Sequence, residues 1–245
     1  MFLSLADNYR AVLFGSSGGI GSALLEKLAE DQRCSKVYAG SRTGKAARGA
    51  RVVPFRFDLQ DEGSIVEAAA MLDENGPGDL VIVSTGLLHD EAVSPEKSLR
   101  QIDQDVLRRV FDINTIGPAL IAKHFLPRLS RPGKSVFAVL SARVGSVSDN
   151  RLGGWHAYRS SKAALHMPVR NFAIELGRTH PNAVCVGLHP GTVDTPLSKP
   201  FQRSLGPDRL FAPSDTADRL IAVLDGLNPG QSGRIFAWDG EEISP

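Results

Sequence analysis

The sequence is poor in cysteine and carries almost no net charge. Its 245 residues include two cysteines, Cys34 and Cys185, which are too few for a disulfide framework or a cysteine-based zinc site. Because 28 Lys and Arg residues are matched by 27 Asp and Glu, the formal net charge is +1. The surplus of positive charge that a general nucleic-acid binder needs is therefore missing. We expect no metal site and no nucleic-acid partner.

Long apolar runs are missing as well. No stretch of the sequence approaches the roughly 20 apolar residues that a membrane-spanning helix needs. Residues 1–10 lack the charged start and the apolar segment of a secretory signal. These two absences predict a cytoplasmic protein with no membrane partner.

Short apolar segments alternate with segments of helical periodicity along the whole chain. The predicted strands are 10–14, 37–39, 52–57, 80–83, 135–140, 184–188 and 234–238. Helical periodicity is found over 20–28, 64–72, 98–129, 157–176 and 215–224. This alternation predicts an α/β fold in which helices cover both faces of a doubly wound, seven-stranded parallel sheet. The length fits one such domain, and we expect residues 1–245 to form it.

Three segments depart from regular periodicity. The helical segment 98–129 is interrupted around 114–118. Pro168 should kink the helix over 157–176, since a proline removes one backbone hydrogen bond. The Pro-rich loop 192–213 is expected to form a mobile flap over a site. Its apolar side chains predict an apolar or mixed substrate; they are Leu197, Phe201, Leu205 and Phe211.

Three glycines follow the first predicted strand with the spacing Gly-x-x-x-Gly-x-Gly. Gly15 permits a tight exit from the strand, Gly19 lets a ligand approach the backbone, and Gly21 lets the helix pack close to the sheet. The start of that helix offers unpaired N–H groups and the positive end of its dipole to a phosphate. The turn therefore predicts a site for the phosphates of a dinucleotide, which also involves Ser17 and Ile20.

The second predicted strand ends in Ser41 and Arg42, with no acidic residue in place. At this point of a dinucleotide site, an acidic residue favours NAD(H), and a basic residue accepts the 2′-phosphate of NADP(H). Arg42 can form two bonds to a phosphate, and Ser41 can add a third. Lys45 and Arg48 add local positive charge. We therefore expect NADP(H) to be favoured over NAD(H).

Tyr158 and Lys162 stand four residues apart in a predicted helix, which places them on one face. A phenol has an unperturbed pKa near 10, too high for easy proton exchange at neutral pH. A neighbouring ammonium favours the phenolate and should lower the pKa of Tyr158. The pair therefore predicts a general acid for carbonyl reduction, or a general base for alcohol oxidation.

The glycine turn together with the downstream Tyr-x-x-x-Lys resembles the short-chain dehydrogenase/reductase family. The resemblance covers almost the whole chain. It implies a single-domain Rossmann fold, an NAD(P)-dependent oxidoreductase and a possible homodimer or homotetramer. It also implies that Lys162 bonds the nicotinamide ribose, and that Asn114, in an Asn-x-x-Gly motif, holds a water that links Lys162 to solvent.

The same resemblance implies further cofactor-binding residues. Asp58 and Leu59, after the third predicted strand, match the place beside the adenine ring. Ser84, Thr85 and Gly86 stand where the family has Asn-Ala-Gly along the adenosine half of the cofactor. The family's Pro-Gly segment, which lies near the nicotinamide and the phosphates, matches Pro190, Gly191, Val193 and Thr195.

At one catalytic position the sequence departs from the family. The family serine that bonds the substrate oxygen matches Ala142 here. Three alternatives remain: Ser141 serves after a small shift of the strand end, Ser146 reaches in from the following loop, or Tyr158 bonds the substrate alone. We favour Ser141, whose direction depends on the alternation of side chains along the strand.

Residues around 143–146, 153–155 and 236–241 resemble a narrower branch, the C-factor and sniffer-type carbonyl reductases. This resemblance implies an NADP(H)-dependent enzyme that transfers a hydride between nicotinamide and a small carbonyl or alcohol substrate. Tyr158 would act as its general acid or base. The alternative is a cofactor-binding signalling or sensor protein of the same fold with little turnover, which Ala142 favours.

Overall fold

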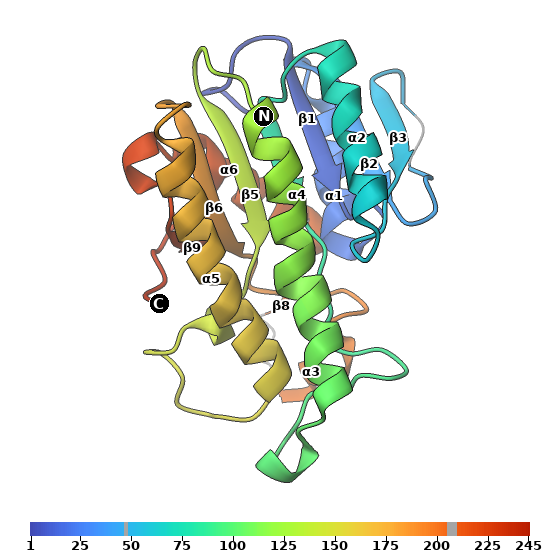
Figure 1. Ribbon diagram of the computed structural model, residues 1–245, viewed down its shortest axis with the longest axis vertical. Coiled ribbons are helices and arrows are strands. Elements are labelled where there is room, and N and C mark those ends of the chain that lie inside the picture. Colours follow the sequence, from blue (N-terminus) through green and yellow to red (C-terminus); the bar gives the residue numbers. More distant parts are fainter. Residues whose placement is uncertain (47–48, 205–209) are drawn as a thin grey trace.

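The computed structural model describes residues 1–46, 49–204 and 210–245. Its centre is a sheet of seven strands in the order β3-β2-β1-β4-β5-β6-β9, and every neighbouring pair is parallel (Figure 1). The predicted doubly wound sheet is therefore confirmed. The strands are β1 (Tyr9–Phe14), β2 (Cys34–Ser41), β3 (Val52–Arg56), β4 (Leu80–Val83), β5 (Ser135–Leu140), β6 (Ala183–His189) and β9 (Ile235–Ala237).

Helices cover both faces of this sheet, which explains why its strands are almost continuously apolar. Side chains alternate between two cores along each strand. In β1, Val12 and Phe14 pack with α2, α4 and α5, whereas Ala11 and Leu13 pack with α1 and α6. The helices are α1 (Gly19–Glu30), α2 (Glu62–Asn75), α3 (Gln104–Phe111), α4 (Gly117–Phe125), α5 (His156–Leu176) and α6 (Pro213–Gly226).

The expected interruption of the long helical segment is present. Between α3 and α4 the chain makes a wider, π-helical turn over Asp112–Ile116, which buries Asn114 completely. By contrast, Pro168 lies inside the single uninterrupted helix α5, which spans 21 residues. The helix therefore continues through the proline, and the expected kink within it stays a prediction.

The segment expected to form a flap contains regular structure. The short strands β7 (Thr192–Val193) and β8 (Leu210–Phe211) pair with each other, and a 3₁₀ turn covers Lys199–Ser204. Two residues of the sequence predictions lie outside the described residues: Leu205, expected in this segment, and Arg48, expected in the basic loop after β2. Among the described residues, no helix is both long and apolar enough to cross a membrane.

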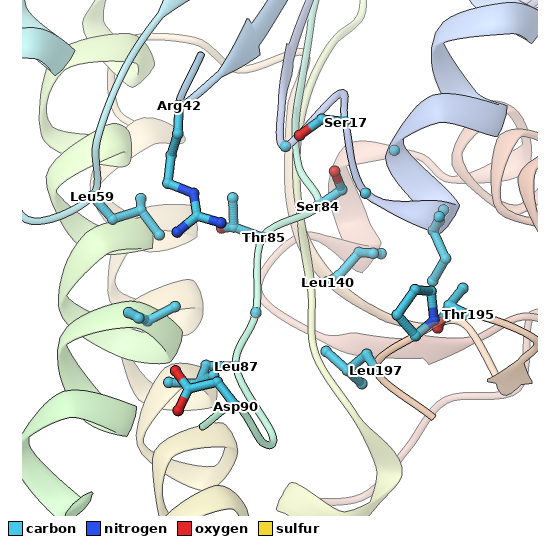
Figure 2. Close-up of a pocket in the computed structure, with 18 of the residues that line it drawn as sticks. Ser17, Arg42, Leu59, Ser84, Thr85, Leu87, Asp90, Leu140, Thr195 and Leu197 are labelled. Atoms are coloured by element: carbon cyan, nitrogen blue, oxygen red, sulfur yellow. The ribbon is translucent and has the colours of Figure 1, made fainter. Parts of the chain in front are cut away.

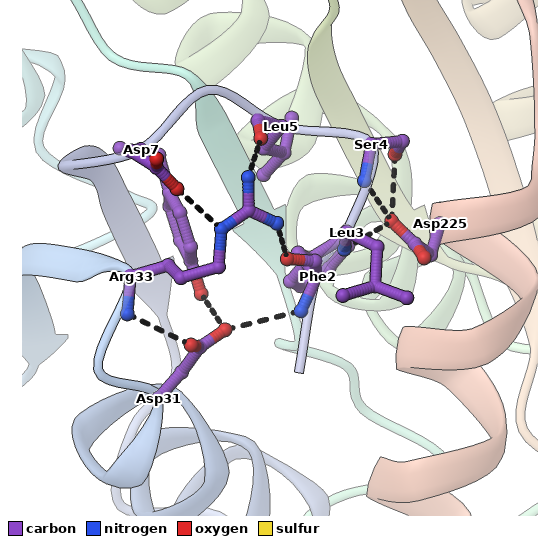
Figure 3. Close-up of polar contacts among 9 residues, drawn as sticks. Phe2, Leu3, Ser4, Leu5, Asp7, Asp31, Arg33 and Asp225 are labelled. Atoms are coloured by element: carbon purple, nitrogen blue, oxygen red, sulfur yellow. Dashed lines mark hydrogen bonds and ion pairs between the residues drawn. The ribbon is translucent and has the colours of Figure 1, made fainter.

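Two carboxylates fix the N-terminal segment at the end of the sheet where the strands begin (Figure 3). Asp31 is buried and Asp225 is half-buried. The Asp31 carboxylate accepts hydrogen bonds from the Phe2 N–H at 3.0 Å, the Arg33 N–H at 3.0 Å and the Tyr9 hydroxyl at 2.9 Å. Burial alone would raise the pKa of Asp31. The bonds from Arg33, Phe2 and Tyr9 together outweigh burial and lower this pKa below its usual range. At the end of α6, Asp225 binds the next residues of the segment in the same way.

Asp31→Ala should lower the free energy of unfolding by about 2–4 kcal/mol, because the buried hydroxyl of Tyr9 and the Phe2 N–H lose a charged acceptor. Since the pKa of Asp31 is lowered in the folded state, its contribution is present above about pH 4 and is lost as the pH falls through the folded-state value. Urea unfolding at several pH values should therefore show a difference between the two proteins that shrinks in acid.

Asp7→Ala is the matched control. Asp7 also binds this segment, through Arg33 at 2.6 Å, but its side chain is 77% exposed. Its removal should cost less than about 1 kcal/mol. Equal losses in the two variants would contradict the importance given to the buried carboxylate.

Candidate active site

A cavity of about 630 Å³ lies at the carboxyl ends of the parallel strands (Figure 2). It crosses the point between β1 and β4 where the order of strands reverses, the usual ligand site of doubly wound sheets. Its volume suits a small organic molecule or cofactor. Its wall consists of residues 15, 17–21, 41–42, 57–60, 84–87, 89–90, 109, 113, 140–141, 158, 162, 190 and 195–197.

The glycine turn after β1 forms one end of the cavity. Gly15 has a φ of +89°, and its N–H donates to the Gly40 carbonyl at 3.0 Å, so the chain turns sharply out of the strand. A Cβ on Gly21 would lie 2.0 Å from the carbonyl oxygen of Gly15. A Cβ on Gly19 would lie 2.5 Å from Cγ2 of Thr195 on the opposite wall. In the described part of the chain, no side chain caps the start of α1, whose positive end therefore faces the cavity uncapped.

Arg42 reaches into the cavity after β2, and Figure 2 shows its guanidinium between Leu59 and Thr85. Among the described residues, none forms an ion pair with Arg42, which leaves its charge available to an anion. The hydroxyl of Ser41 bonds the backbone of Lys45. It donates to the Lys45 carbonyl at 2.8 Å and accepts from the Lys45 N–H at 3.1 Å, which fixes the loop that carries Arg42.

Tyr158 and Lys162 lie in the cavity wall on one face of α5. The ammonium of Lys162 is almost fully buried and donates to the Leu140 carbonyl at 2.8 Å. Burial lowers the pKa of Lys162 to about 8 and raises the pKa of Tyr158 to about 12. The expected lowering of the phenol pKa is therefore wrong for this arrangement. Burial disfavours the phenolate, and the lysine nitrogen is held by Leu140, 5.9 Å from the centre of the Tyr158 ring.

Asn114 lies behind this pair and joins two walls of the cavity. Its amide nitrogen donates to the Leu87 carbonyl at 2.8 Å and to the Ser161 hydroxyl at 3.1 Å. Its oxygen accepts from the Leu87 N–H at 2.8 Å. The side chain thus fixes the chain that leaves β4 against α5, beside Lys162.

Ser141 lies in the cavity wall, and the alternation along β5 explains its direction. Phe137 and Val139 pack in the core beneath α2, α4 and α5, so Ser141 points toward the same side as α5. Ser146, the second alternative, is not among the described residues that line the cavity. The hydroxyl of Ser146 instead accepts from the Asp149 N–H at 3.1 Å within its own loop. Of the two serines, the geometry favours Ser141, and its bond to the substrate oxygen stays a prediction.

The structure does not bring two of the predicted cofactor-binding residues into the described cavity wall. Pro190 and Thr195 line the cavity, but Gly191 and Val193 are not among its described lining residues. Gly191 has a φ of +77°, and a Cβ there would lie 2.6 Å from the ring of Phe211. Gly191 therefore allows the turn before Thr195, and Val193 is buried and pairs with Phe211 of β8.

The sequence interpretation missed polar residues at the far end of the cavity. Nε2 of His89 lies 3.2 and 3.1 Å from the carbonyl oxygens of Pro196 and Leu197, which joins the chain after β4 to the chain after β7. Arg109 of α3 binds the Asp90 carboxylate at 2.6 Å. The available signal was the pair His89-Asp90, separated by two residues from Ser84-Thr85-Gly86. Arg109 gave no signal, because it reaches the cavity through the packing of α3.

A second missed residue is His166. Its Nε2 lies 2.8 Å from the hydroxyl oxygen of Ser141, and both residues are buried. The signal in the sequence was its spacing, four residues after Lys162 and eight after Tyr158, which places all three on one face of the helix.

Comparison with known proteins agrees with this architecture. A family model described as short chain dehydrogenase matches residues 10–205. C-signal of Myxococcus xanthus is 37% identical over 147 residues, which are 60% of this chain and 82% of that protein. The 1-hydroxy-2-glutathionyl-2-methyl-3-butene dehydrogenase of Rhodococcus sp. (strain AD45) is 32% identical over 232 residues, covering 94% of this chain and 96% of that one.

Solved structures share the fold. The NADPH-bound carbonyl reductase from chicken fatty liver superimposes with a TM-score of 0.83 at 23% identity, covering 99% of this chain and 96% of that one. The carbonyl reductase Sniffer of D. melanogaster gives a TM-score of 0.81 at 19% identity, covering 98% of this chain and all of that one (100%). The expected resemblance is confirmed by these matches.

Lys162→Met should increase the free energy of unfolding at pH 7, by about 3 kcal/mol, because the folded state no longer holds a buried ammonium whose pKa is lowered from 10.5 to about 8. Between about pH 8 and pH 10.5, the lysine side chain is protonated more fully in the unfolded chain than in the folded one. The stability of the parent protein should therefore rise through this window, and the advantage of the variant should shrink. Urea unfolding at pH 7, 8.5 and 10 measures this, and a difference that does not change with pH would contradict it.

Proposed function

This chain belongs to the short chain dehydrogenase family, and on that basis we propose that it is an NADP(H)-dependent oxidoreductase that interconverts a carbonyl and an alcohol. One observation carries the proposal. The glycine turn, Arg42, Tyr158, Lys162 and Ser141 come from four distant parts of the chain and line a single cavity.

The residues present fit a nicotinamide dinucleotide with a 2′-phosphate. Gly15 and Gly21 let the turn and α1 pack closely together, and Gly19 presents its backbone to the cavity, so a pyrophosphate would bind at the uncapped start of α1, with Ser17 and Ile20 beside it. Arg42 would bind the 2′-phosphate, since it brings an unneutralised charge to this end of the cavity. The adenosine would lie along residues 58–59 and 84–86, and the nicotinamide half against Lys162, Pro190 and Thr195. When bound, the nicotinamide supplies or accepts the hydride.

The protein's own residues would supply the proton that the substrate oxygen receives. Because burial raises the pKa of Tyr158 to about 12, its hydroxyl stays protonated at neutral pH and is ready to donate to a carbonyl oxygen. Lys162 holds a positive charge beside the site of the developing alkoxide. Ser141 would bond the substrate oxygen, and Asn114, which holds the chain after β4 against α5, would complete the proton relay. At neutral pH the protonated Tyr158 would serve as the general acid of carbonyl reduction.

The substrate end of the cavity is of mixed character. Leu87, Ile113 and Leu197 provide apolar surface, and His89 with the Asp90–Arg109 pair adds polar groups. These walls suit a small carbonyl compound or alcohol with an apolar body and room for a polar substituent. The Rhodococcus relative, named as a dehydrogenase of a glutathionyl alcohol, supports an alcohol or carbonyl as the reacting group.

A cofactor-binding signalling protein is the second candidate. Two observations favour it: Ala142 stands where the family has a serine, and a relative that covers 60% of this chain is named C-signal. Such a protein would keep the glycine turn and Arg42 and would have little need of the proton chemistry of Tyr158 and Lys162. The two candidates therefore differ in turnover and agree in cofactor binding.

Tyr158→Phe should lower kcat/KM for carbonyl reduction by about 10²–10⁴, because the variant has no hydroxyl to donate the proton. Its Kd for NADPH, measured by fluorescence titration, should stay within about threefold of the parent value. Tyr38→Phe is the control, since Tyr38 is a buried tyrosine whose hydroxyl has no partner among the described residues. Equal rates for Tyr158→Phe and the parent would refute the proposed mechanism.

Arg42→Ala should weaken NADPH binding by about 10–100-fold, the effect of losing a charge-assisted bond to a phosphate. NADH, which has no 2′-phosphate, should be affected much less. Isothermal titration with each cofactor measures both constants. Lys45→Ala is the control, because Lys45 is a neighbouring cation outside the described cavity wall, and its loss should affect NADPH only weakly. Equal losses of NADPH and NADH in Arg42→Ala would overturn the cofactor assignment.

A further inference from the structure

One face of α5 carries three functional groups in succession. Tyr158, Lys162 and His166 follow one another at intervals of four residues, which places them in a row along the helix. The last two each hold the end of β5. Lys162 donates to the carbonyl of Leu140, and Nε2 of His166 lies 2.8 Å from the hydroxyl oxygen of Ser141. The helix face that carries Tyr158, the proposed proton donor, is therefore bonded to the end of β5.

The backbone and side chain of Ser141 are both fixed. Its N–H donates to the Leu188 carbonyl at 2.7 Å, which extends the pairing of β5 with β6 by one residue. Ser141 is 4% exposed and His166 is 9% exposed, so water competes little for the bond between their side chains. Burial and the charge of Lys162 lower the pKa of His166 to about 4, and the imidazole is therefore neutral at physiological pH.

A serine hydroxyl has one hydrogen to donate and two lone pairs that accept. If Nε2 of His166 carries its hydrogen and donates to Ser141, the hydroxyl hydrogen of Ser141 stays available to the cavity, whose wall it forms. If Nε2 accepts instead, that hydrogen is used within the protein. The form of His166 therefore decides whether Ser141 can donate to a carbonyl oxygen.

We propose that His166 is a positioning residue, whose Nε2–H donates to Ser141 and directs the serine hydroxyl toward the substrate oxygen in place of the hydroxyl that Ala142 lacks. This inference rests on the proposed carbonyl reduction, in which His166 would orient the Ser141 hydroxyl for its bond to the substrate oxygen. The bond also gives a reason why a histidine is buried one helical turn beyond Lys162, beside a like charge that raises the cost of protonating it.

The test combines Ser141→Ala with His166→Phe, which keeps a ring of similar size and removes the nitrogen. The assay follows NADPH oxidation with the ketone, aldehyde or quinone that the parent enzyme reduces fastest. Ser141→Ala should lower kcat by about 10²–10³, as the loss of one oxyanion donor does. His166→Phe should lower kcat by about 10–100-fold with the NADPH Kd unchanged. The double variant should be no slower than Ser141→Ala alone, because His166 acts only through the Ser141 hydroxyl, which Ser141→Ala already removes.

Two further variants separate positioning from a purely structural role. His166→Gln, which can place an amide N–H near the position of Nε2, should restore kcat to within about fivefold of the parent. His180→Phe removes another buried histidine bonded to a hydroxyl, that of Thr179 at 2.8 Å, away from the described cavity wall, and should leave kcat unchanged. If Gln does not rescue, or if the losses from Ser141→Ala and His166→Phe multiply in the double variant, the proposal is wrong.

The form of His166 can be measured without turnover. Long-range ¹H–¹⁵N spectra of the protein should show a neutral imidazole with its hydrogen on Nε2. A hydrogen on Nδ1 would overturn the proposal. The outcomes also separate this inference from the proposed function. An inactive Tyr158→Phe with a fully active His166→Phe contradicts the role of His166 alone, whereas a fully active Tyr158→Phe contradicts the proposed reaction itself.

Discussion

The close approach of α1 to the turn after β1 is the constraint on which the site depends. A Cβ on Gly21 would lie 2.0 Å from the carbonyl oxygen of Gly15, and a Cβ on Gly15 would lie 2.8 Å from the hydroxyl of Ser84 in the neighbouring chain after β4. Only glycine allows these three segments to meet. Their contact places the positive end of α1 at the switch point of the sheet, where the cavity opens.

The opposite wall depends on α5. Lys162 and His166 hold the end of β5, while Asn114 in its π-helical turn holds the chain after β4 against the same helix. These contacts bury a lysine whose pKa falls to about 8, so the site is built at a cost in stability that the two apolar cores must offset. The N-terminal segment, fixed by Asp31 and Asp225 at the other edge of the sheet, stabilises the fold away from the chemistry.

Much of this could be predicted from the sequence, because it rests on local patterns. Apolar runs and helical spacing predict the strands and helices, and the glycine spacing and the Tyr158–Lys162 interval predict both ends of the cavity. The direction of the Tyr158 pKa could not be predicted, since it depends on burial and on the Leu140 carbonyl that holds Lys162. Arg109 and His166 were missed for the same reason: each reaches its partner across tertiary packing.

We propose that NADPH bound in this cavity transfers a hydride to a carbonyl. NADPH oxidation by the purified protein can be followed over a panel of ketones, aldehydes and quinones, with each product identified by mass spectrometry. We expect saturable reduction of at least one compound to its alcohol, with a higher kcat/KM for NADPH than for NADH. Saturable binding of NADPH with no turnover of any compound would contradict the proposal.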